Sequence, residues 1–137
     1  MMRIYKFALA CLLTLFAGCS AFSNATDPLA GISWELYTLG DTRPIDGSRL
    51  TISFEDGNIS GTAGCNSYGG SYQLDGDRIF FGEIFATLMA CVESEGRMDQ
   101  EALFLRYLGE AQRFELADGQ LQIFWSEHEA LTFVPAE

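Results

Sequence analysis

Hydrophobic and polar residues alternate with a period of two along most of the chain after residue 33. In a β-strand, successive side chains point to opposite faces, so such alternation buries one set and exposes the other. The alternating runs cover residues 34–38, 50–55, 113–116, 121–125 and 131–133. The pattern predicts short strands that each bury one face in a common core.

Asp-Gly pairs separate several of these runs. One of them, Asp46-Gly47 after Pro44, indicates a looser turn, and the other three are Asp56-Gly57, Asp75-Gly76 and Asp118-Gly119. A two-residue hairpin turn of type I′ needs positive φ at both central positions, which Asp and Gly tolerate. We therefore expect tight hairpins at these places and an antiparallel arrangement of the strands.

One segment, residues 98–109, repeats its apolar residues at helical spacing. The apolar stripe consists of Met98, Ala102, Leu105 and Leu108, and it is widened by Phe104 and Ala111. Asp99 and Glu101 stand near the start, where carboxylates interact favourably with the helix dipole. The sequence thus predicts a mostly β fold with one packed helix, whose apolar stripe belongs to the core and closes one face or mouth of the sheet.

The beginning of the chain has the composition of an export signal. Arg3 and Lys6 precede an apolar run over residues 7–17, which is too short to span a membrane as a helix. The run ends in Leu15-Phe16-Ala17-Gly18-Cys19, which resembles a lipobox, the motif at which a signal is removed and the cysteine is lipidated. Secretion without a lipid and an uncleaved anchor are the alternatives.

Three parts of the chain follow from this pattern. We expect residues 1–18 to be a lipoprotein signal peptide, with Cys19 as the lipidation site. Residues 19–30 are small and polar, which is typical of a tether. Residues 31–137 then form one folded domain.

Residues 19–137 are strongly acidic. They contain all 19 acidic residues, six arginines and no lysine, so their formal charge is −13. Such a surface repels phosphate backbones and anionic headgroups, which argues against nucleic-acid binding. Solubility is the simplest reason for this charge, and attraction to a basic partner is the alternative.

The cysteines suggest one disulfide. Cys11 would leave with the signal and Cys19 would carry the lipid, so Cys65 and Cys91 remain as a pair in an oxidising compartment. Redox-active pairs usually stand close together as Cys-x-x-Cys, whereas these two lie 26 positions apart. We expect a structural disulfide, with free thiols or redox work as the alternatives.

Glycines are most frequent in residues 61–72, where they indicate positive φ, a bulge or a close backbone approach. A phosphate-binding loop would need a Lys-Ser/Thr pair and a helix after it, and this segment has neither. We expect Gly64 and Gly70 to be structural positions of the loop. Asn66 and Thr87 should serve as internal hydrogen-bond partners of irregular backbone, with a role in ligand binding as the alternative.

The sequence offers no catalytic or metal-binding set. His128 is the only histidine, and it stands between Glu127 and Glu129 in a predicted exposed hairpin tip. A zinc site needs three or four nitrogen or sulfur ligands, and too few remain. Asp75-Gly76-Asp77 is too short for a calcium loop. We therefore expect no enzymatic activity, no metal and no cofactor.

An ordered set of motifs runs through the chain: Trp34, Gly64-Cys65-Asn66, Gly70-Ser71-Tyr72, Thr87-Leu88-Met89-Ala90-Cys91, Glu101 and Phe104-Leu105. This set resembles the META domain family, which includes HslJ-like heat-shock lipoproteins of bacterial envelopes. The resemblance covers about residues 31 to 134. It implies a small, partly open, lipocalin-like β-barrel with one packed helix, and it implies no enzyme.

Together these observations favour a non-enzymatic envelope lipoprotein that stabilises or binds an envelope component under stress. It would face the periplasm, attached to a membrane through the lipid at Cys19. Ser20 is not the aspartate that is linked to inner-membrane retention, so the outer membrane is favoured. The alternatives are a barrel that binds a hydrophobic small molecule in a cavity of several hundred Å³, and an inhibitor of an envelope enzyme.

Overall fold

The computed structural model describes residues 26–92 and 95–137. The predicted signal peptide and the lipidation site Cys19 lie outside these residues. The elements are β1 (Ser33–Leu39), β2 (Thr51–Glu55), β3 (Asn58–Thr62), β4 (Ser67–Asp75), β5 (Arg78–Phe81), β6 (Phe85–Ala86), α1 (Arg97–Gly109), β7 (Arg113–Ala117), β8 (Gln120–Phe124) and β9 (Ala130–Pro135). The prediction of a mostly β chain with one helix is confirmed.

Eight of the strands form a closed antiparallel barrel. Their order is β3-β2-β1-β9-β8-β7-β5-β4, and the pairing of β3 with β4 closes the ring. β5 and β6 lie one after the other along the second edge of β4, where Tyr72 pairs with Phe81 and Tyr68 pairs with Ala86. β6 is therefore a short extension of the barrel wall.

The weakest joint in the ring lies between β5 and β7. One register pair, Arg78 with Arg113, connects these strands. Two backbone hydrogen bonds flank it, from the Ile79 N–H to the Gln112 carbonyl (3.3 Å) and from the Phe114 N–H to the Asp77 carbonyl (2.8 Å). The expected partly open character is confined to this joint, because every other neighbouring pair in the ring has three or more register pairs.

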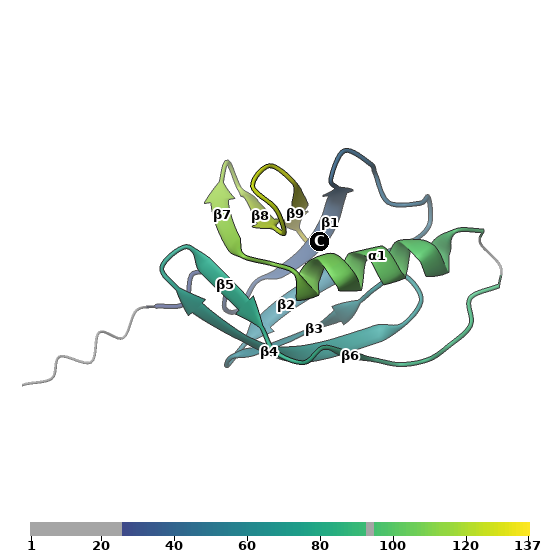
Figure 1. Cartoon of the computed structure of the whole chain (residues 1–137), viewed down its shortest axis with the longest axis horizontal. Coiled ribbons are helices and arrows are strands. Elements are labelled where there is room, and N and C mark those ends of the chain that lie inside the picture. Colours follow the sequence, from purple (N-terminus) through teal and green to yellow (C-terminus); the bar gives the residue numbers. More distant parts are fainter. Residues whose placement is uncertain (1–25, 93–94) are drawn as a thin grey trace, which may run out of the picture.

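Side chains fill the interior of the barrel. The largest fully buried ones include Phe54, Phe104 and Phe133. Helix α1 lies across the front of the barrel, between the β4–β6 side and the β7–β9 side (Figure 1). It places the Phe104 ring 5.6 Å from Tyr68 on β4 and 6.4 Å from Phe133 on β9, measured between ring centroids. The helix thus completes the core.

The predicted alternation matches the buried positions of most strands. Leu50, Ile52 and Phe54 are buried, whereas Glu55 is exposed. Leu116 on β7 is an exception, because its side chain is 41% exposed. β7 pairs with β5 only at its first residue, so Leu116 lies beyond the joint and lacks a neighbouring strand on that side.

The buried face of α1 differs from the predicted one. Glu101, Phe104 and Leu108 are its buried residues, at the spacing i, i+3, i+7 of one helix face. Met98 and Ala102, which the sequence assigned to the core, are exposed instead. Relative to the predicted orientation, the helix is rotated about its axis so that Glu101 faces the core. The hydrogen bonds described below explain this rotation.

Two of the three predicted turns have the expected geometry. Asp56 and Gly57 both have positive φ (49° and 77°), as do Asp118 and Gly119 (53° and 75°). The third turn is shifted by one residue, because Asp75 pairs with Arg78 and leaves Gly76 and Asp77 as the central residues. Positive φ is found there only at Gly76 (62°), as in a type II′ turn.

The end of the predicted tether belongs to the folded part. Leu29 is fully buried, and the Gly31 N–H donates to the Phe54 carbonyl on β2 (3.0 Å). The Tyr72 hydroxyl donates to the Asp27 carboxylate. Residues 27–30 therefore pack against the barrel, whereas residues 19–25 lie outside the described part of the chain.

Candidate functional site

A buried carboxylate organises the start of β4. The Oε2 atom of Glu101 accepts from the backbone N–H groups of Cys65 (3.1 Å) and Asn66 (2.7 Å). Its Oε1 atom accepts from the side-chain amide of Asn66 at 2.6 Å. Gly64 has φ of 103°, a conformation that favours glycine, and it directly precedes these two donors in the chain. Glu101 is only 6% exposed, and hydrogen bonds from N–H groups stabilise its position.

Asn66 connects this carboxylate to the chain after β6. Its Oδ1 atom accepts from the Thr87 hydroxyl (2.9 Å) and from the Met89 N–H (2.6 Å). Its Nδ2 atom also donates to the Met89 carbonyl at 3.3 Å. A side-chain amide with four such contacts inside a protein is fully satisfied. We call the three side chains of Asn66, Thr87 and Glu101 the Asn66 cluster.

The expected disulfide is present and fixes the same region. Cys65 and Cys91 are joined, with Cα atoms 6.0 Å apart. The segment 87–91 is therefore held by the Asn66 cluster at one end and by the disulfide at the other. Gly64, Asn66 and Thr87 come together here, whereas Gly70 lies further along β4. A Cβ atom on Gly70 would stand 2.9 Å from the Glu83 carbonyl, so the close approach of another backbone requires glycine there.

A groove of about 430 Å³ opens between this segment and α1. Its walls are mostly apolar, and its lining consists of Asn66, Ala86, Thr87, Leu88, Met89, Ala90, Met98, Glu101, Ala102 and Leu105. Leu88 is 98% exposed and Met89 is 57% exposed. Nearby Val92 is 88% exposed. We call this hollow the α1 groove.

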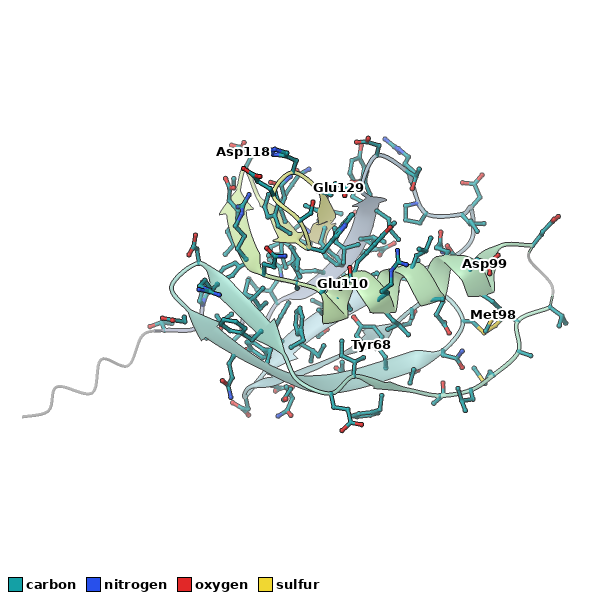
Figure 2. All side chains as sticks on the ribbon, in the orientation of Figure 1. Tyr68, Met98, Asp99, Glu110, Asp118 and Glu129 are labelled. Carbon is teal, nitrogen blue, oxygen red and sulfur yellow. A yellow bond between two sulfur atoms is a disulfide. The ribbon has the colours of Figure 1, made fainter. Side chains whose placement is uncertain are left out.

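Met98 forms part of the helix wall of the α1 groove. Figure 2 shows it in the first turn of α1, on the side of the segment that leads into the helix. The same view shows Tyr68 between β4 and the helix. The Tyr68 hydroxyl donates to the Thr51 carbonyl at 2.7 Å, and burial raises the pKa of this tyrosine, so it stays neutral. The groove thus lies on the outside of a helix whose inner face is firmly packed.

The remaining candidates from the sequence stand apart from this groove. His128 is exposed in the β8–β9 connection, with its Nε2 atom 3.9 Å from Glu127. Within residues 26–92 and 95–137, no three His, Cys, Asp or Glu side chains gather where they could hold a metal ion. In the same part of the chain, no helix has the length and apolar character needed to cross a membrane.

The part that Glu101 plays was not predicted from the sequence, where this carboxylate was assigned to the helix dipole. One signal could have revealed it. Glu101 shares its helix face with Phe104 and Leu108, and a carboxylate on a buried face requires hydrogen-bond donors opposite.

The model of the META domain matches residues 27–137, which include the whole barrel, the Asn66 cluster and the disulfide. The chain belongs to the META domain family. This family is not known for enzymatic activity. No curated protein matches the chain.

Solved structures share the META fold of this chain. An NMR structure of a protein from Burkholderia xenovorans is 27% identical, with a TM-score of 0.63, and the match covers 79% of this chain and 83% of the other. A DUF4847 family protein from Bacteroides vulgatus is 13% identical, with a TM-score of 0.55, and the match covers 78% of this chain and 94% of the other. The second likeness concerns the fold alone.

Proposed function

We propose that this META protein is a non-enzymatic lipoprotein of the bacterial envelope that binds another envelope component through the α1 groove. The observation that carries the proposal is the exposure of Leu88 and Met89 on the segment 87–91, which hydrogen bonds and a disulfide fix in place, with the exposed Val92 directly after it. Contiguous exposed apolar side chains are uncommon on monomeric proteins and often mark interaction sites.

The fixed position of the segment favours binding. A partner that docks on a preformed surface loses less conformational entropy than one that must order a mobile loop. Burial of apolar surface contributes about 25 cal/mol per Å². Glu101 is the only titratable side chain that lines the groove among the described residues, and both of its oxygens already accept hydrogen bonds. This chemistry suits binding rather than catalysis.

The filled interior argues against the alternative of a hydrophobic ligand inside the barrel. That function needs an enclosed apolar cavity, whereas Phe54, Phe104 and Phe133 occupy the space. Five hollows of about 250 to about 450 Å³ open to solvent on the outside. Inhibition of an envelope enzyme is one form that binding through the groove could take.

Membrane attachment through Cys19 is the second part of the proposal. Changing Cys19→Ser should abolish the incorporation of labelled palmitate, because the cysteine that would carry the acyl chains is gone. Cys11→Ser is the matched control, since this residue lies in the predicted signal, and it should leave the incorporation unchanged. Metabolic labelling followed by immunoprecipitation measures both results. A Cys19→Ser protein that still takes up the label contradicts the lipid anchor.

Crosslinking in intact cells tests the groove. A photoreactive amino acid in place of Leu88 should give a crosslinked product with a specific envelope component. The same amino acid in place of Leu116, an exposed apolar residue on β7 outside the groove lining, should give none. Gel mobility and mass spectrometry identify the product. Absence of a product at Leu88, or identical products at both positions, contradicts the proposed function.

A further inference from the structure

We infer that the α1 groove takes a cationic amphipathic protein segment, in which large apolar side chains stand between lysines or arginines. The inference rests on the proposed function and names the chemistry of the partner. Two observations carry it, namely the apolar walls of the groove and the sign of the charge around it.

The one charged side chain that lines the groove, among the described residues, is the carboxylate Glu101. Glu95 is exposed just before the helix, whereas Asp99 lines a neighbouring hollow of α1 together with Arg43. Arg97 directly precedes Met98, but its guanidinium lies on the side of Gly47 and does not line the groove. On the exposed side of the same helix, the Arg106 Nε atom lies 4.0 Å from the Glu110 carboxylate, so its charge is partly neutralised. A cation at the rim of the groove would therefore be attracted.

The charge of the whole domain points in the same direction. Residues 19–137 carry a formal charge of −13 and contain no lysine. Anionic lipid headgroups and nucleic acids would be repelled by this surface. A second copy of the chain would bring an equal negative charge to the contact. The electrostatic field of the domain therefore favours a basic protein segment as the partner.

The shape of the groove favours a protein segment over an acyl chain. Pockets for small apolar ligands bury most of the ligand surface, whereas this groove opens to solvent along its length. Its floor is polar, with the Asn66 cluster below walls that contain Met89 and Met98. Methionine is flexible and adapts to side chains of different shape. Apolar side chains of the segment would lie between these walls, while its cations would lie at the solvent-exposed rim.

Peptide binding tests the inference with the full lipidated protein in phosphatidylcholine nanodiscs, with empty nanodiscs as the blank. The probe is a short fluorescent peptide of alternating leucine and lysine, measured by anisotropy. One control peptide has glutamate in place of lysine, and the other has serine in place of leucine. The leucine–lysine peptide should bind at least about tenfold more tightly than either control. Its affinity should fall as the salt concentration rises from about 0.05 M to about 0.3 M.

Matched variants localise the binding. Met98→Ser should weaken binding of the leucine–lysine peptide by about tenfold. Leu116→Ser should leave it unchanged, although both parent side chains are 41% exposed. Each variant replaces an exposed side chain, so the fold should be retained.

The outcomes separate the inference from the proposed function. Equal binding of the lysine and glutamate peptides, or no binding of any peptide, overturns the inference about the cationic segment. The proposed function then still depends on the crosslink at Leu88. Weakened binding in Met98→Ser together with unchanged binding in Leu116→Ser supports the inference, whereas equal losses in both overturn it.

Discussion

Replacement of Glu101 by alanine should lower the free energy of unfolding by about 3–5 kcal/mol. The change removes the acceptor for three donors, which are the N–H groups of Cys65 and Asn66 and the side-chain amide of Asn66. Each buried donor left without a partner costs about 1–3 kcal/mol. Urea denaturation followed by tryptophan fluorescence measures the loss, because Trp34 and Trp125 are both buried.

Two further variants serve as controls for this prediction. Glu110→Ala removes an exposed carboxylate directly after α1 whose ion pair with Arg106 is long, so it should change stability by less than about 1 kcal/mol. Glu101→Gln keeps the size of the side chain but turns an NH₂ group toward the donors, and its loss should be intermediate. If Glu101→Ala is as stable as Glu110→Ala, the Asn66 cluster does not hold the loop.

Removal of the disulfide should have the second largest effect. The double change Cys65→Ser and Cys91→Ser should lower the free energy of unfolding by about 3–4 kcal/mol, because the unfolded chain regains the entropy of a long loop. The two residues are 26 positions apart. Urea denaturation without reductant measures the loss, and addition of dithiothreitol should bring the parent protein close to the variant.

The same experiment contains its own check. Dithiothreitol should leave the double variant unchanged, because it has no disulfide to reduce. Equal midpoints for the oxidised parent and the double variant contradict the prediction, as does a count of two free thiols in the oxidised parent. Because Cys91 and Glu101 restrain the same segment, their combined loss should not equal the sum of the separate losses.

The sequence was sufficient for features that depend on local patterns. The period of two identifies strands such as β2, where Ile52 and Phe54 are buried, because strand geometry alone decides which side chains share a face. The Asp56-Gly57 turn follows from the backbone preferences of two adjacent residues. The pairing of Cys65 with Cys91 followed once Cys11 and Cys19 were assigned to the predicted signal and lipidation site, because two cysteines then remain.

The sequence was insufficient for features that are determined by contacts between distant segments of the chain. Apolar character alone places Met98 and Ala102 in the core, and it leaves Glu101 outside. In the structure Glu101 is buried while Met98 and Ala102 are exposed. The burial of this carboxylate is favourable because the N–H groups of Cys65 and Asn66 donate hydrogen bonds to it. These donors lie 36 and 35 positions away in the chain, so no local pattern reveals them. The α1 groove exists because of this rotation, which leaves Met98 at the surface.

The length of β4 separates the two ends of the molecule. Asn66 precedes its first residue, whereas the turn at Gly76 and Asp77 follows its last one, beside the hollow that Thr26 and Asp27 line. The described chain therefore begins on the side opposite the loop before α1 (Figure 1). A nine-residue strand spans about 30 Å. The acyl anchor that we propose at Cys19 would then place the bilayer near this end of the protein and leave the α1 groove at the far end, toward the aqueous compartment.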